Sequence, residues 1–382
     1  MRLLDRYVLR NFLEPFLLCF FGFLAIWLVF DLSDNGPDFI AADASLKVVA
    51  GFYLTQFPQI ITITLPVGLL LALLFSLSKM SRSNELISML TAGRSVIRVI
   101  LPLLVIGVLA SLLLLALNYE LAPHAEAIKA VALEQISHKR KATERPPIEG
   151  HLFRDRQTLR TWFVRKLRPG QSTLDDVHII QQDEEGNITR KWYATRATWD
   201  ARTGNWVLLR GMRLTFDRDG NVESTLDFRN DPRTTSGWTE TPRRIASSSL
   251  HPQNLSVPEL RDYLQINADF PRAQLASYRT LLQHRFALPW SCLVVVFVAA
   301  PLGIVYSRRG VLAGVASSIF IFFGMIFLTN FFLALGKGDR ISPFAAAWAP
   351  NLLIGGIGLV LLYFRATNRD FPKLSFNFGK SK

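Results

Sequence analysis

VVAGFYLTQFPQIITITLPVGLLLALLFSLS, residues 48–78, runs from Lys47 to Lys79 without a charged side chain. The hydrocarbon core of a bilayer takes about 20 apolar residues per helical span. This stretch therefore predicts a transmembrane helix. Half of the 382 residues are hydrophobic, and the mean hydropathy of +0.24 is too high for an ordinary soluble chain of this length. A bilayer is the expected solvent.

Five further intervals between consecutive charged residues are long enough, or nearly so, to cross a bilayer. They are Glu14 to Asp31, Arg98 to Glu120, Arg285 to Arg308, Arg309 to Lys337, and Arg340 to Arg365. The first is the shortest, but residues 16–30 are almost wholly apolar, and the flanking carboxylates can lie at the interfaces. No small-residue cleavage site follows this run, so a signal anchor fits better than a cleaved signal peptide. The sequence thus predicts six transmembrane helices.

The distribution of charge orients these spans, because Lys and Arg accumulate in short loops that stay in the cytoplasm. The N-terminal segment, the 79–98 loop, the Arg308-Arg309 loop and the C-terminal tail together carry +10, whereas the short loops on the opposite side carry −2. Both termini are therefore expected in the cytoplasm of a bacterium and the large domain in the periplasm. The net charge of +13 is mainly a topology signal, so no nucleic-acid partner is expected.

Residues 121–280, between the third and fourth predicted spans, contain no run long enough to cross a membrane. A helix is expected to extend the third span over residues 122–141. Short runs of alternating hydrophobicity follow, with hairpin-turn signals at Glu185-Gly186-Asn187, Thr203-Gly204-Asn205 and Asp219-Gly220-Asn221. Such strands predict a β-sandwich-like domain. Residues 232–252, which are polar and contain proline, are expected to form a loop or linker. A short helix is expected over residues 258–264, and a further helical segment over residues 273–285.

The fold class predicted from these patterns is an α-helical membrane protein with six transmembrane helices and an inserted all-β domain. Residues 1–120 hold the first three helices, residues 121–280 the β domain with flanking helices, and residues 281–382 the last three helices and a cytoplasmic tail. Cys19 and Cys292 both fall inside predicted spans, so they carry no functional signal.

The sequence contains none of the usual enzyme motifs, and its six histidines lack metal-ligand spacing. We therefore expect no catalytic residue, metal or cofactor in this chain. A secondary transporter needs ionisable groups at membrane depth to bind the coupling ion. The predicted spans have none between their flanking charges, so transport by this chain would take its energy from elsewhere.

Residues 81–98, on the cytoplasmic side, predict a short amphipathic helix over about 82–94. Ser83 or Asn84 can cap its start, and Glu85 lies in the first turn, where the helix dipole favours a carboxylate. Leu86, Met89 and Leu90 recur at helical spacing and form one apolar face. Two interpretations remain open on these residues. The helix either rests on lipid headgroups or docks in a groove of a cytoplasmic partner.

This segment resembles the coupling-helix motif of the LptF/LptG (YjgP/YjgQ) permeases, which export lipopolysaccharide. The match consists of Glu85-Leu86, Ala92-Gly93-Arg94-Ser95 and Arg98. Further matches, in the family's order, are Asp5-Arg6-Tyr7, Pro66, Ala122-Pro123, Tyr193-Ala194-Thr195, Trp206-Val207-Leu208, Ala299-Ala300-Pro301-Leu302, Arg308-Arg309-Gly310 and Pro350-Asn351. The resemblance covers essentially the whole chain and leans toward the LptG-like branch.

The resemblance implies a permease subunit that pairs with a homologous subunit in an LptF/LptG heterodimer in the inner membrane. It further implies a cytoplasmic LptB-type ATPase dimer, which would hold the ATP and magnesium, and an LptC-type periplasmic bridge protein that receives the lipopolysaccharide. The β domain is then expected to be a β-jellyroll. The partner-binding residues of the coupling helix are expected to be Arg82, Glu85, Leu86, Met89, Leu90, Gly93, Arg94 and Arg98.

Two aromatic stripes are the remaining candidate site. Helical spacing places Phe20, Phe23, Trp27 and Phe30 on one face of the first span, and Phe320, Phe323, Phe327 and Phe331 on one face of the fifth. Such stripes commonly face lipid or pack against other helices. The resemblance implies instead that they line a lateral gate for acyl chains.

LptG-like members often carry phosphate-binding lysines at the outer end of the first helix. Here that stretch is Phe30-Asp31-Leu32-Ser33-Asp34, so no phosphate-binding residue is assigned to it. The chief rival function is a membrane-anchored sensor or scaffold whose β domain binds a ligand.

Overall fold

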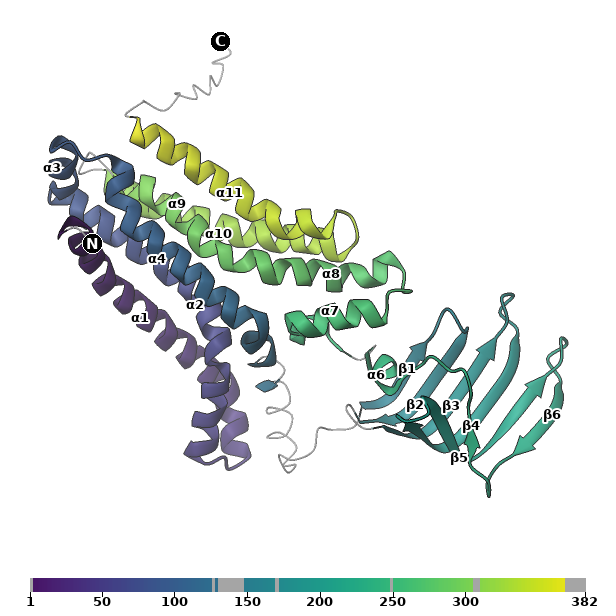
Figure 1. The fold of residues 1–382 in the computed structure, drawn as a ribbon. Helices are drawn as coiled ribbons and strands as arrows, with labels where there is room; N and C mark the ends of the chain where they lie inside the picture. Colours follow the sequence, from purple (N-terminus) through teal and green to yellow (C-terminus); the bar gives the residue numbers. More distant parts are fainter. Residues whose placement is uncertain are drawn as a thin grey trace, which may run out of the picture. The chain divides into compact units, whose positions relative to one another are not determined.

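The structure, a computed structural model, describes residues 3–125, 128–129, 148–168, 172–247, 250–304 and 310–367. The chain divides into two compact units, one formed by Met1–Lys129 with Ala276–Lys382 and the other by Ala130–Leu275. The first unit is helical and the second contains one β-sheet (Figure 1). Most of the helix predicted over residues 122–141 lies outside the described residues, as do Arg308, Arg309 and the C-terminal tail from residue 368.

The helical unit has the expected three-plus-three order of long helices. They are α1 (Leu3–Ala41), α2 (Leu46–Arg82), α4 (Val96–Ala116), α9 (Ser291–Gly303), α10 (Gly310–Lys337) and α11 (Pro343–Ala366), with α3 (Glu85–Thr91) between α2 and α4. Among the described residues, five helical stretches are long and apolar enough to cross a membrane. The 28-residue α10 is the sixth apolar helix. The prediction of an apolar helical protein with an inserted β domain is therefore confirmed.

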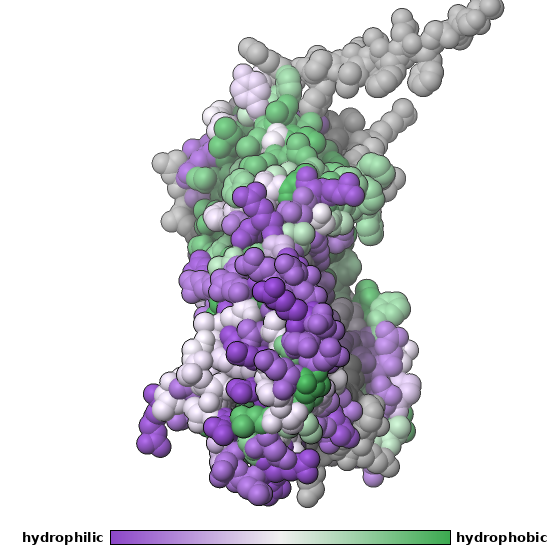
Figure 2. Space-filling view, turned by 90° about the vertical axis from the view of Figure 1, so that its right-hand side faces the viewer, coloured by the Kyte–Doolittle hydropathy of each residue, from purple (hydrophilic) through white to green (hydrophobic). Residues whose placement is uncertain are grey.

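The space-filling view shows the same division of polarity. Hydrophobic side chains gather on the helices, and hydrophilic side chains cover most of the visible surface of the sheet domain (Figure 2). An apolar outer surface on helices is stable only in a lipid-like solvent, whereas a polar surface needs water. The two units are thus suited to different solvents.

Helix α9 packs against α2, α4, α10 and α11 at the centre of the helical unit. Small residues permit this close approach. A Cβ at Gly303 would lie 2.7 Å from Leu77, and a Cβ at Gly358 would lie 2.9 Å from the backbone of Phe297. Helices in lipid gain stability from such close packing, since lipid tails are as apolar as leucine side chains. Gly303 and Gly358 therefore allow close packing between helices.

Buried amides compensate for a break in the helix that leads into α9. Pro289 lies in a 3₁₀ turn (η3, Leu288–Trp290) between α8 (Arg272–Ala287) and α9. Proline has no N–H, so the carbonyl of Arg285, four residues earlier, loses its helical donor. Asn118, fully buried, donates to that carbonyl at 2.8 Å, and Asn351 donates to the carbonyl of Ala287 at 2.6 Å. The two carbonyl groups at the break therefore accept hydrogen bonds from side chains of other helical segments.

Asn118 lies in a π-helical turn, η1 (Leu117–Leu121), at the end of α4. The guanidinium of Arg285 donates to the Asn118 side-chain oxygen at 3.0 Å. The asparagine therefore both donates to and accepts from the same residue, which ties the two halves of the helical unit together. π-Turns often lie at positions under functional constraint.

The β domain is a seven-stranded antiparallel sheet in the order β1-β2-β3-β4-β5-β6, with β7 paired to β5. The strands are β1 (Ile148–Arg154), β2 (Arg160–Leu167), β3 (Thr173–Gln182), β4 (Ile188–Asp200), β5 (Asn205–Phe216), β6 (Val222–Asp227) and β7 (Arg233–Thr234). Gly186, Gly204 and Gly220 in the connecting turns all have positive φ. The predicted hairpin turns are confirmed.

Aromatic side chains fill the inner face of this sheet. Trp162 lies 5.3 Å from Trp206 and 5.4 Å from Trp238, and Trp238 lies 5.3 Å from Trp192, measured between ring centroids. Trp162 and Trp206 are fully buried. Because tryptophan removes the largest apolar area from water of any side chain, this cluster dominates the core of the domain.

Residues 235–247 cover this core, so the prediction of a simple loop over 232–252 is wrong. The region contains β7, a short helix α6 (Pro242–Ser247) and a 3₁₀ turn η2 (Pro252–Asn254). Glu240 is fully buried; its carboxylate accepts from Thr158 at 2.8 Å and lies 2.8 Å from Arg160. Burial lowers the pKa of Arg160, an effect that the nearby Glu240 opposes. The buried ion pair between Glu240 and Arg160 therefore holds residues 235–247 against the sheet.

A helix pair follows the cover. α7 (Val257–Ile266) begins with a capping box, in which Ser256 and Glu259 satisfy each other's backbone N–H groups. The chain then enters α8. Both helices occur where the sequence predicts them, over 258–264 and 273–285.

Candidate functional site

The α3 loop, residues 82–98, joins α2 to α4. Asn84 occupies the N-cap position with φ of 60°, but its side chain makes no capping hydrogen bond, unlike the expectation. Ala92 is the C-cap, and Gly93 follows with φ of 81°, a conformation that favours glycine. The helix proper is seven residues long, Glu85–Thr91.

The apolar face of α3 packs against the chain itself. Leu86 is only 2% exposed, and Met89 and Leu90 pack against the core formed by α2, α4 and α9. The chain's own core therefore covers Leu86 fully and covers Met89 and Leu90 in part. The outward surface consists of Arg82, Gly93 and Arg94, with small polar side chains between them.

Two polar contacts hold this loop against α1. The Tyr7 hydroxyl donates to Glu85 Oε2 at 2.9 Å, and Arg98 Nη2 donates to Asp5 Oδ2 at 3.4 Å. The contact between Tyr7 and Glu85 is exposed to solvent, whereas the contact between Arg98 and Asp5 is partly buried. The expected partner-binding residues Glu85 and Arg98 thus already have intramolecular partners.

The first aromatic stripe is divided between packing and exposure. Phe20 lies against Gly68, where a Cβ would be 3.4 Å from the Phe20 Cα. Trp27 meets Tyr53 edge-on at 6.5 Å, and Phe23 is half-buried. Phe30 alone is largely exposed, at 69%. This stripe mostly faces α2 in the isolated chain.

The second stripe is exposed along its whole length. Phe320 and Phe327 are 80% and 68% exposed, and Phe327 stacks on Phe331 at 6.2 Å. Phe323 and Phe331 are also exposed. Helix α1 likewise exposes apolar side chains such as Leu18 and Val29. The structure thus has two apolar surfaces, on α1 and on α10, that no described element covers.

A charged pair lies at the end of α1 opposite the α3 loop. Lys129 Nζ is 2.5 Å from Asp31 Oδ1, and it also lies 5.7 Å above the Trp27 ring. Asp31 is 9% exposed. Asp31 of α1 therefore forms an ion pair with Lys129, which lies in the segment that follows the third span.

Within the described residues, no group of three or more His, Cys, Asp or Glu side chains could hold a metal ion. The features that stand out are the α3 loop, with its contacts to α1, and the exposed apolar side chains on α1 and α10.

Sequence reasoning singled out Asp5-Arg6-Tyr7 but did not predict its contacts. Glu85 lies 78 positions from Tyr7, and Arg98 lies 93 positions from Asp5, so no local periodicity links them. The opposite charges of Asp5 and Arg98, on segments predicted to lie on the same side of the membrane, were the available signal.

Comparison with known proteins agrees with this architecture. The model of the family described as lipopolysaccharide export system permease LptF/LptG matches residues 6–363. The lipopolysaccharide export system permease protein LptG of Haemophilus influenzae is 25% identical over 239 residues, which cover 59% of this chain and 62% of that protein. The alignment therefore spans less than two thirds of this relative. Since the family match extends over nearly all of the helical unit and the sheet domain, the chain belongs to the LptF/LptG family of permeases.

Proposed function

We propose that this chain is the non-catalytic permease subunit of an ATP-driven transporter that extracts lipopolysaccharide from the bacterial inner membrane. The observation that carries the proposal is the contact of the α3 loop with α1. It connects a polar surface suited to protein contact with a helix whose outer surface suits lipid. Both termini and the α3 loop are then cytoplasmic, and the sheet domain is periplasmic.

A homologous subunit of the LptF/LptG heterodimer is the proposed partner within the membrane. The uncovered apolar surfaces on α1 and α10 support this, because two such surfaces from each subunit can enclose a space for acyl chains. Phe320, Phe323, Phe327 and Phe331 would then face lipid chains.

An LptB-type ATPase dimer is the proposed partner in the cytoplasm, and it would bind the ATP and magnesium. Docking uses the outward residues Arg82, Gly93 and Arg94, with Glu85 at the rim. Because Glu85 and Arg98 also bind α1, movement of the docked loop would pull on the cytoplasmic end of α1. A nucleotide-driven movement is thereby passed to a lipid-facing helix.

The periplasmic β domain is proposed to pass the lipid to an LptC-type bridge protein. Its inner face is packed with the chain's own tryptophans under residues 235–247. Lipid transfer along that face would require the cover to move. The name of the Haemophilus relative supports the cargo assigned here.

Reconstitution tests the proposal. The chain is purified alone and together with its co-expressed partner subunits, and both samples are placed in proteoliposomes containing lipopolysaccharide. We expect no ATP hydrolysis by the chain alone, and lipid release to a bridge protein only with the complex and ATP. Release driven by a proton gradient without ATP would contradict it.

The rival function, a membrane-anchored sensor or scaffold, is separated by co-purification. A transporter subunit should bring down an ATPase in stoichiometric amount. A sensor with a ligand-binding β domain should bring down none.

A further inference from the structure

The sheet of the β domain carries an irregularity at the same level on five neighbouring strands. In a regular strand, residues alternate between the two faces. Here β2, β3, β4 and β5 each have two consecutive residues directed away from the core. The outward pairs are Arg165-Lys166, Asp175-Asp176, Thr195-Arg196 and Leu209-Arg210.

The inserted residues form a row that crosses the sheet. Arg165, Asp176, Thr195 and Arg210 stand opposite one another, yet each is skipped in the register of regular pairs. Gly150 of β1 completes the row. Gly150, Asp176 and Arg210 have φ of 69°, 55° and 51°. The left-handed conformation thus recurs on every second strand.

Left-handed backbone is unfavourable for Asp176 and still more for Arg210, since a side chain with a Cβ crowds the following carbonyl. The residue after Arg210 lies very close to the neighbouring strand. A Cβ on the next residue, Gly211, would lie 1.8 Å from the Tyr193 carbonyl oxygen, so β5 is held tightly against β4. Strain that surrounding structure maintains is concentrated at functional sites in proteins.

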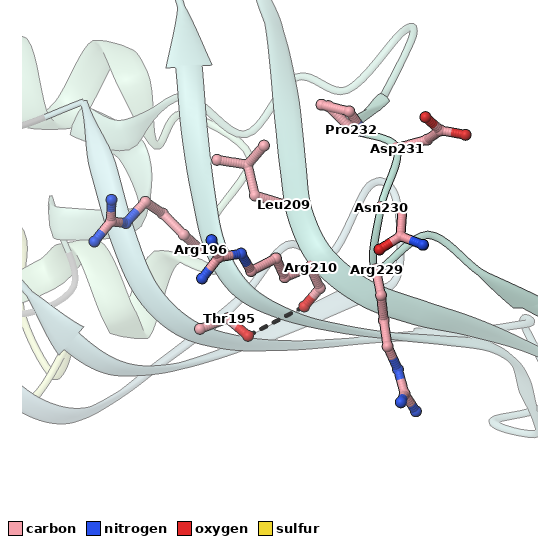
Figure 3. A pocket seen from close by; sticks show the side chains of 8 residues that line it. All are labelled: Thr195, Arg196, Leu209, Arg210, Arg229, Asn230, Asp231 and Pro232. Carbon is pink, nitrogen blue, oxygen red and sulfur yellow. Dashed lines mark hydrogen bonds between the residues drawn. The ribbon is translucent and has the colours of Figure 1, made fainter.

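The row opens onto a concavity on the outer face of the sheet. Two adjoining pockets, each of about 330 Å³, meet at Thr195, Arg210 and Arg229. Figure 3 shows Arg210 extended in the direction of Arg196 while Arg229 points away from both. Thr195 donates to the Arg210 carbonyl at 3.1 Å, which fixes the bulge from the neighbouring strand.

Not every arginine around the concavity has a carboxylate as an ion-pair partner. Arg196 is 3.2 Å from Asp175, and Arg229 is 3.2 Å from Asp227. Asp176 and Asp231 also line the pockets, and Asp176 is 3.0 Å from Arg165. Among the described residues, these ion pairs leave Arg210 without a carboxylate partner. The strained residue therefore contributes a guanidinium without an ion-pair partner to pockets that also contain Asp176 and Asp231.

We propose that this concavity is a binding site for a phosphate monoester, with Arg210 as its central ligand. A guanidinium presents parallel N–H donors that match phosphate oxygens in pairs. Arg196 supplies a second guanidinium from the adjacent strand, and the exposed Arg229 can turn toward the same group. The proposal does not rest on the transport role. A lipid headgroup and a soluble phosphate share this chemistry, and the two are distinguished by experiment.

The test uses the full-length chain in zwitterionic detergent and two probes. One is inorganic phosphate and the other is a short-chain phosphatidic acid, and binding is followed by phosphorus NMR titration. Arg210→Asn removes the charge but retains a side chain that tolerates left-handed backbone. Arg210→Lys keeps the charge and loses the paired donors. Arg218→Asn, in the exposed turn between β5 and β6, is the matched control.

We expect saturable binding of at least one probe, weakened on the order of tenfold or more by Arg210→Asn, weakened less by Arg210→Lys and unchanged by Arg218→Asn. Binding of both probes indicates a soluble phosphate as the ligand, and binding of the phosphatidic acid alone indicates a lipid headgroup. If Arg210→Asn does not fold, Arg210→Lys replaces it in the test. Weaker binding by Arg210→Lys than by wild type then supports Arg210 as the central ligand. Absence of saturable binding, or equal affinities for Arg210→Asn and Arg218→Asn, overturns the proposal.

Discussion

The Tyr7 hydroxyl donates a 2.9 Å hydrogen bond to Glu85 Oε2 and thereby joins the first helix to α3. The second link, Arg98 to Asp5, lies at the other end of the same loop. With the apolar face of α3 packed inward, the loop has one fixed orientation relative to α1. A partner that moves the loop must therefore move α1 or break these contacts.

The first prediction separates the two roles of Glu85. Glu85→Lys should strongly reduce co-purification of the partner ATPase, because it reverses the charge at the rim of the proposed docking surface, where an acidic side chain is proposed to meet a basic residue of the ATPase. Tyr7→Phe should leave co-purification nearly intact while weakening the link to α1, since a neutral hydrogen bond contributes about 0.5 to 1.5 kcal/mol. Pull-down at matched expression measures the first effect. Lipid release by the reconstituted complex measures the second.

Undiminished recovery of the ATPase with Glu85→Lys would show that Glu85 serves only the contact with Tyr7. Both variants should insert normally into the membrane, because Tyr7 and Glu85 lie outside the apolar centre of every span. Membrane fractionation provides that control.

Two glycines in α11 give a matched comparison of helix packing. Gly358→Ala should destabilise the helical unit by about 1 to 3 kcal/mol, because the added Cβ would meet the Phe297 backbone, which cannot rotate away. Gly356→Ala meets nothing within 4 Å and should be neutral or slightly stabilising. Thermal unfolding of the detergent-solubilised chain measures both. Equal shifts in Tm for the two variants would exclude the close contact.

Removal of the buried carboxylate in the β domain should destabilise that domain. Glu240→Gln leaves Arg160 buried without its counter-charge, a loss that typically costs about 3 to 5 kcal/mol. Glu223→Gln, on the exposed strand β6, should change stability by less than about 0.5 kcal/mol. Tryptophan fluorescence during urea unfolding reports on the domain, because its core is a tryptophan cluster. A Glu240→Gln transition that coincides with wild type would contradict the anchoring role.

The proposed orientation is tested by reporter fusions. A fusion at Asn187, in the turn between β3 and β4, should report a periplasmic location, and a fusion at Gly310, at the start of α10, a cytoplasmic one. The reason is the excess of Lys and Arg in the loops assigned to the cytoplasm. The same location for both fusions would refute the six-span arrangement.

The sequence by itself determined the elements whose cause is local. Charge-free intervals place the spans, because a helix in lipid satisfies its own backbone and needs only apolar side chains. The hairpins follow from Gly186, Gly204 and Gly220, since only the turn residues need to adopt positive φ. The short helix Glu85–Thr91 is likewise encoded by its own residues, including the glycine that ends it.

Only the tertiary structure decided which residues from distant segments contact one another. From its periodicity alone, the apolar stripe of α3 could contact headgroups, a partner or the chain's own core. The burial of Leu86 shows that this residue contacts the chain's own core. Pairing of Tyr7 with Glu85, of Asp31 with Lys129 and of Asn118 with Arg285 depends on helices approaching in space. The strained row through Asp176 and Arg210 is also a tertiary property, because each bulge exists only against the bulge of the neighbouring strand.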